Sequence, residues 1–135
     1  MKHYKGNIQP ADDIIFVFGS NTEGRHGAGS ARVALKQFGA IYGAPNGLQG
    51  QSYALITTDL SSKDPYPLDM IEENIRVLYQ VARNIPWKRF MVAYRSKSEE
   101  TTLCGYTGRQ LLNCFLKAGD IPDNIYFSEE WYSMM

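Results

Sequence analysis

The stretch from Asp13 to Phe38 constrains the fold of this chain more than any other. It opens with five consecutive apolar residues, Ile14 to Phe18, in which apolar and polar side chains do not alternate. Such a run is typical of a strand that is buried on both faces. A loop follows, and apolar residues then recur from Ala31 to Phe38 at the spacing of one helix face. The sequence therefore predicts a central strand that leads through a loop into a helix.

The loop between this strand and this helix holds Gly24, Gly27 and Gly29. A helix N-terminus that follows such a loop offers unpaired backbone N–H groups and the positive end of the helix dipole, which together suit a phosphate group. Tight packing of the loop is the alternative reason for three glycines so close together. We expect a phosphate-type ligand here, with tight packing as the competing interpretation.

Composition limits the class of protein. The 135 residues are 44% hydrophobic and 21% charged, which fits one soluble globular domain spanning residues 1–135. Lys and Arg number 14 against 14 Asp and Glu, so there is no overall positive charge for nucleic acid. Cys104 and Cys114 are too few, and wrongly spaced, for a metal cluster or a disulfide scaffold. With a polar start and no long apolar run, the chain is expected to be cytoplasmic, without metal or cofactor.

The remaining elements alternate between strand and helix patterns. A loop is expected from Gly39 to Gln51, and Ser30 is expected to cap the first helix. Further helices are expected from Leu68 to Asn84 and after a Thr107-x-x-Gln110 capping box. The sequence thus predicts an α/β fold of three layers, with a mostly parallel sheet between helices. The other expected strands are His3–Ile8, Ser52–Thr58, Arg89–Tyr94 and Asn124–Ser128.

Two common nucleotide motifs do not fit the glycine loop. A Walker A loop ends in Gly-Lys-Ser/Thr, but Gly29 is followed by Ser30 and no lysine. A dinucleotide fingerprint needs a third glycine and an acidic residue about twenty positions later, and both are absent.

Four stretches of the chain have counterparts in one known family. They are Gly6-Asn7-Ile8, Phe18-Gly19-Ser20-Asn21, Arg25-His26-Gly27-Ala28-Gly29 and the segment from Glu100 to Tyr106. In these stretches, and in its ending from Pro122 to Trp131, the chain resembles the macro domain, the ADP-ribose-binding α/β module. The likeness is greatest to a divergent branch from bacterial and phage proteins.

The resemblance implies a cleft between two loops in which ADP-ribose or a related nucleotide diphosphate binds. Three departures bear on this site. Asn7 stands where macro domains have the acidic residue that recognises the adenine amino group, Phe18 replaces an asparagine, and Thr102 replaces a glycine near the phosphates. The ligand-binding residues that the resemblance implies are Asn7, Ile8, Gly19, Ser20, Asn21, Arg25, Gly27, Ala28, Gly29, Ser30, Thr101, Thr102, Gly105 and Tyr106.

Asn21 and His26 are the catalytic candidates. The resemblance places Asn21 beside the distal ribose, while its place at a strand end is also typical of a turn-forming residue. His26 is either a substrate contact or proton carrier, or a solvated loop residue. The run from Arg95 to Glu100 is expected to be a solvated loop, and Cys104 is not expected to act as a nucleophile.

Three functions stay open at this point. The chain is a hydrolase of an ADP-ribosyl linkage, or a reader that binds free or protein-linked ADP-ribose without turnover. Alternatively, it is a non-catalytic interaction protein of phage or mobile-element type with a degenerate nucleotide cleft. Aromatic residues near the end would then supply a surface for a protein partner: Tyr126, Phe127, Trp131 and Tyr132. The expected partners are an ADP-ribose-like molecule or an ADP-ribosylated protein, and neither a membrane nor nucleic acid.

Overall fold

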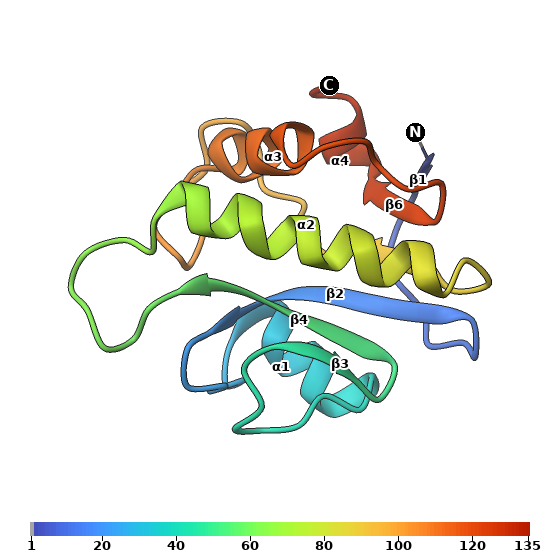
Figure 1. Cartoon of the computed structure of the whole chain (residues 1–135), viewed down its shortest axis with the longest axis horizontal. Helices are drawn as coiled ribbons and strands as arrows, with labels where there is room; N and C mark the ends of the chain where they lie inside the picture. Colours follow the sequence, from blue (N-terminus) through green and yellow to red (C-terminus); the bar gives the residue numbers. More distant parts are fainter. Residues whose placement is uncertain (1) are drawn as a thin grey trace.

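The computed structural model describes residues 2–135, which form one mixed sheet of six strands with helices on both faces (Figure 1). The strands are β1 (Lys2–Tyr4), β2 (Ile14–Asn21), β3 (Gly47–Gln49), β4 (Ser52–Thr58), β5 (Arg89–Val92) and β6 (Ile125–Ser128). The helices are α1 (Gly29–Gln37), α2 (Leu68–Asn84), α3 (Gly108–Lys117) and α4 (Glu129–Tyr132).

The strand order in the sheet is β1-β6-β5-β2-β4-β3. All neighbouring strands are parallel except β3, which pairs antiparallel with β4. The strand predicted from Ile14 to Phe18 belongs to β2 and lies between β5 and β4, inside the sheet. The predicted α/β fold, with its mostly parallel central sheet, is therefore confirmed.

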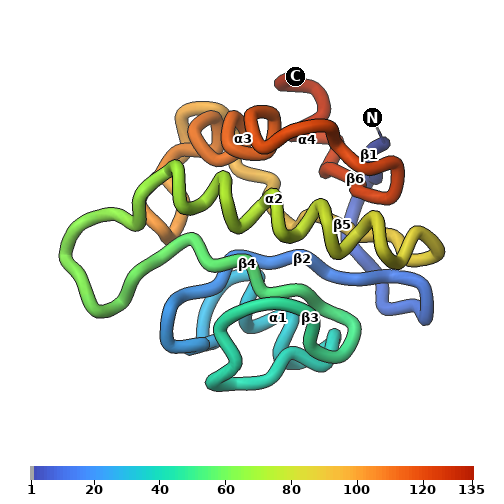
Figure 2. The backbone as a smooth tube through the Cα atoms, in the orientation of Figure 1, coloured from blue at the N-terminus to red at the C-terminus, as the bar shows by residue number. Residues whose placement is uncertain are grey.

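Helices cover the two faces of the sheet unequally. Figures 1 and 2 show α2, α3 and α4 on one face and α1 on the other. Because side chains alternate along a strand, Ile15 and Val17 of β2 pack in the core beneath α2 and α3, while Phe16 and Phe18 pack towards α1. A strand between two helix layers must be apolar on both faces, which explains the uninterrupted run in β2.

The two longer helices of the first face follow from their own sequence patterns. Helix α2 has the predicted bounds, and its apolar stripe, including Ile71, Ile75 and Leu78, is buried against the sheet. Helix α3 begins with the predicted capping box, in which Thr107 and Gln110 each bond the other's backbone N–H.

Three local predictions were wrong. The segment predicted as loop from Gly39 to Gln51 contains β3, a strand of three residues, which is too short to show a period-2 pattern. Strand β1 ends at Tyr4 rather than Ile8, and Gly6, with φ of 72°, turns the chain away from the sheet edge. The short helix α4, capped by Ser128, was not predicted at all. No helix among residues 2–135 is long and apolar enough to cross a membrane.

Candidate functional site

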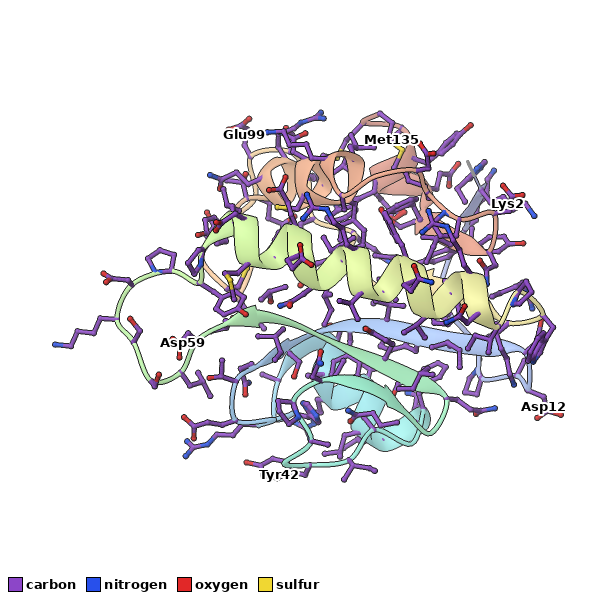
Figure 3. The ribbon with its side chains drawn as sticks, viewed as in Figure 1. Lys2, Asp12, Tyr42, Asp59, Glu99 and Met135 are labelled. Carbon is purple, nitrogen blue, oxygen red and sulfur yellow. The ribbon has the colours of Figure 1, made fainter. Side chains whose placement is uncertain are left out.

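A cleft of about 540 Å³ lies at the carboxyl ends of β2, β4 and β5. In a parallel sheet flanked by helices, ligands bind at this end of the strands. Figure 3 shows the direction in which the strands run, because Asp59, just after β4, and Asp12, just before β2, lie at opposite ends of the molecule. The walls of the cleft come from the end of β2 and the loop after it, from the start of α1, and from the segment between β5 and α3.

The N-terminus of α1 faces this cleft without a cap. Ala28 occupies the N-cap position in an extended conformation, and no side chain caps the helix. The first turn contains no acidic residue. Within residues 2–135 the backbone N–H groups of Gly29, Ser30 and Ala31 have no hydrogen-bond partner. The prediction that Ser30 caps the helix is wrong, because Ser30 lies inside its first turn. The uncapped N–H groups beside the cleft favour an anion.

The floor of the cleft contains a phenol. The Tyr94 hydroxyl lies 3.5 Å from Thr57 Oγ1 and directly over the Cα of Gly19, where a β-carbon would collide with it. The Tyr94 ring stacks on Trp131, with ring centroids 5.2 Å apart. Burial raises the pKa of Tyr94, so that the phenol stays protonated and can donate a hydrogen bond. Gly19 is therefore required by the close approach of Tyr94, and Tyr94 offers a neutral donor.

A second pocket, of about 480 Å³, adjoins the first. We call it the Asn7 pocket; it is lined by Asn7, Ile8, Gln9, Phe16, Ser30, Val33, Gln37, Ala93 and Arg95. Three of these residues, Ser30, Ala93 and Arg95, also line the cleft. The two cavities thus share part of their lining beside the uncapped end of α1.

Arg95 stands where the two cavities meet. Its guanidinium donates to the Gly6 carbonyl, lies 5.7 Å from the centre of the Tyr4 ring, and approaches Glu130 at 4.0 Å. Burial raises the pKa of Tyr4 to about 12, although Arg95 opposes the shift, so Tyr4 is a neutral ring. The prediction of a solvated loop from Arg95 to Glu100 is wrong at its start, since Arg95 and Ser96 line the cleft and the Trp131 indole donates to the Ser96 carbonyl.

The second loop, from Thr101 to Thr107, is closed by its own hydrogen bonds. The N–H and hydroxyl groups of Thr102 both donate to the Tyr106 carbonyl at 2.8 Å, and the Gly105 N–H donates to the Thr102 carbonyl. Thr102 and Gly105 therefore have no free N–H for a phosphate. The N–H groups of Leu103 and Cys104 remain without a partner in the described chain. The Cys104 thiol lies 3.1 Å from Thr102 Oγ1.

Asn21 lines the cleft, but its side chain already organises the first loop. Its Oδ1 accepts from the N–H groups of Glu23 and Arg25, at 3.2 and 2.9 Å, and its Nδ2 donates to the Arg25 carbonyl at 3.0 Å. These bonds are those of a turn-forming residue. A contact with the distal ribose, which the family resemblance implies, stays a prediction.

His26 does not line the cleft, and the prediction of a solvated loop residue is wrong, while a substrate contact or proton transfer stays a prediction. The ring is completely buried, 5.0 Å from Phe18 in an edge-on arrangement, and its Nε2 lies 3.0 Å from the Ala44 carbonyl. Its Nδ1 is buried without a partner in the described chain. Burial arises because the chain near Ala44 folds back over the loop: a β-carbon on Gly24 would lie 2.6 Å from the Ala44 N atom.

The other predicted residues divide into two groups. Several do not line either cavity: Gly27, Gly29, Gly105 and Tyr106. The Tyr106 hydroxyl instead donates to the Tyr66 carbonyl, and Gly29 lies under Leu103, whose Cδ1 would be 2.9 Å from an added β-carbon. Those that line the cleft or the Asn7 pocket are Asn7, Ile8, Gly19, Ser20, Asn21, Arg25, Ala28, Ser30, Thr101 and Thr102.

The residues that the sequence analysis missed include Thr57, Thr58, Ala93, Tyr94 and Arg95. Thr57 and Thr58 end β4, and the other three residues directly follow β5, so all of them lie at the carboxyl ends of the strands, where ligands bind in parallel sheets. Within residues 2–135, no three His, Cys, Asp or Glu side chains lie together as metal ligands.

Comparison with known proteins supports the fold alone. No protein-family model and no curated protein sequence matches the chain. A solved structure described as alphavirus P23pro-zbd is similar, with a TM-score of 0.66 and 15% sequence identity. The similarity covers 98% of this chain and 22% of that one, so this chain spans about a fifth of the length of the protein that it matches.

Proposed function

We propose that this protein binds an ADP-ribose-like nucleoside diphosphate along the surface formed by the cleft and the Asn7 pocket. The observation that carries the proposal is the uncapped N-terminus of α1 at the junction of the two cavities. A diphosphate at this junction accepts hydrogen bonds from the N–H groups of Ser30 and Ala31 and is stabilised by the helix dipole.

The two cavities suit the two ends of such a ligand. The Asn7 pocket combines the apolar surfaces of Ile8, Phe16 and Val33 with amide side chains, which suits a nucleobase. The larger cleft is polar, with Asn21, Arg25, Thr58 and the Tyr94 phenol available to a ribose. The resemblance of the sequence to macro domains implies the same arrangement, with the base near Asn7 and the distal ribose near Asn21.

Binding without turnover is the form of the proposal that the geometry favours. Among the described residues that line the cleft, Glu100 is the one carboxylate, and its Oε1 accepts from the Lys97 N–H at 3.0 Å. His26, the candidate proton carrier, is buried away from the cleft. Under the alternative function, in which aromatic residues near the end bind a protein partner, Phe127 and Trp131 do not contribute to the surface, because both are fully buried.

The substitution Ala28→Asp tests the phosphate position. Aspartate at this N-cap supplies the missing cap and places a negative charge where the phosphates bind. We expect the free energy of unfolding to rise by about 1 kcal/mol, and the affinity for ADP-ribose to fall at least tenfold. Titration calorimetry and urea denaturation measure the two quantities.

Ala28→Ser is the matched control, because serine caps the helix without charge and should weaken binding less. If Ala28→Asp bound ADP-ribose with the affinity of the wild type, the phosphates would not bind at the N-terminus of α1. If the wild type gives no heat with millimolar ADP-ribose, the interaction-protein alternative is favoured.

A further inference from the structure

Two arginines and one glutamate are the charged residues, among those described, that line the cleft. Arg25 is already paired, since its Nη2 lies 3.0 Å from Glu23 Oε1 at the exposed rim. Arg95 differs, because its nearest carboxylate, Glu130, lies 4.0 Å from Nε, at the limit of an ion pair. Arg95 therefore keeps a positive charge that no close carboxylate neutralises.

The Arg95 side chain is held in place without using all its donors. One terminal nitrogen donates to the Gly6 carbonyl, and the guanidinium lies beside the Tyr4 ring. Tyr4 is itself fixed, because its hydroxyl donates to the Val92 carbonyl at 2.6 Å. A guanidinium has five N–H donors in a rigid plane, so donors remain for a ligand.

The position of Arg95 matches one part of the proposed ligand. It lines both cavities, together with Ala93 and with Ser30 in the uncapped first turn of α1. A nucleoside diphosphate that spans both cavities must pass its phosphates through this shared region. There the phosphates meet N–H groups from α1 and a guanidinium from the end of β5.

We propose that Arg95 recognises the diphosphate and makes the site select nucleoside diphosphates over monophosphates and nucleosides. This inference rests on the proposed function. The α1 N–H groups form one anion site, and Arg95 supplies the fixed positive charge that the additional phosphate needs. Its planar fork binds two phosphate oxygens at once, which a lysine ammonium does not.

The test is titration calorimetry of the full chain with adenosine, AMP and ADP. The wild type should bind ADP at least tenfold more tightly than AMP. In Arg95→Gln, whose side chain is neutral and shorter than the guanidinium, ADP affinity should fall between tenfold and a hundredfold, the range expected for a charged hydrogen bond. Adenosine affinity should stay within about twofold. Arg95→Lys should recover part of the loss.

Two further variants are controls for a change of charge in or near the cleft. Arg25→Gln removes a cleft arginine that is assigned to the distal ribose, which ADP and AMP both lack, so it should leave the ratio of ADP to AMP affinity within about twofold of the wild type. Glu130→Gln removes the carboxylate that approaches Arg95, and should leave ADP affinity equal or raise it.

Equal losses of ADP and adenosine affinity in Arg95→Gln would overturn the inference, since they would show a supporting role alone. An unchanged ratio of ADP to AMP affinity in that variant would also overturn it, while nucleotide binding by the wild type would leave the proposed function standing. No binding of any of the three probes by the wild type would overturn both.

Discussion

The side chain of Asn21 makes three hydrogen bonds to backbone atoms two and four residues later. Asn21→Ala removes all three from an exposed loop, so we expect the free energy of unfolding to fall by about 1–2 kcal/mol. Because the loop borders the cleft, AMP and ADP-ribose should lose affinity by a similar small factor. Urea denaturation and calorimetry measure these effects. A loss confined to ADP-ribose, or to release of ADP-ribose from a modified protein, would instead show a direct contact with the distal ribose.

His26 is a core residue by its contacts. Two substitutions distinguish the packing of its ring from the hydrogen bonding of its nitrogens. His26→Ala empties a fully buried site beside Phe18, and should lower the free energy of unfolding by about 2–4 kcal/mol. His26→Phe keeps the ring and removes the unpaired Nδ1, while the Ala44 carbonyl keeps its bond from Gln49 Nε2 at 3.0 Å. We therefore expect His26→Phe to lie within about 1 kcal/mol of the wild type in urea denaturation. Equal destabilisation by both variants would show that the imidazole nitrogens, rather than packing, hold this loop.

At the scale of elements, an ion pair joins the starts of β2 and β5 at the end of the sheet away from the cleft. Arg89 donates from Nε to Asp13 Oδ2 at 2.7 Å, and this bond holds the pKa of Asp13 below its ordinary value. A carboxyl group with a lowered pKa contributes stability above its ordinary pKa and loses it as the pH falls through the lowered one.

We expect the free energy of unfolding of the wild type to fall more steeply than that of Asp13→Asn as the pH falls from about 5 to about 2. Urea denaturation at a series of pH values measures the two slopes. Parallel curves for the two proteins would show that the pair contributes no pH dependence.

Helices and strands that are specified by their own residues could be predicted from the sequence. Contacts between segments far apart in the chain could not. Helix α2 carries its own apolar period, and α3 its own capping box, so both were placed correctly. His26 is buried by residues 18 positions away, and Arg95 is placed by Gly6, 89 positions earlier. No local pattern encodes either contact. A phosphate-type ligand beside the glycine loop was expected from the local residues, whereas the cleft between two loops and a contact at Asn7 were expected from the resemblance to a family.

On the scale of the whole molecule, the pairing of β1 with β6 sets an order of assembly. Lys2 to Tyr4 are synthesised long before their partners in the sheet, Tyr126 to Ser128. Gly6, which lies between β1 and the pocket residues Asn7 to Gln9, accepts a hydrogen bond from Arg95, which is also made later than β2 and α1. The central strands and α1 can associate while synthesis continues, whereas the segment that begins at Gly6 lacks its hydrogen bond from Arg95 until Arg95 has been made. The part of the Asn7 pocket formed by Asn7, Ile8 and Gln9 is therefore completed after the parts formed by Phe16 of β2 and Val33 of α1.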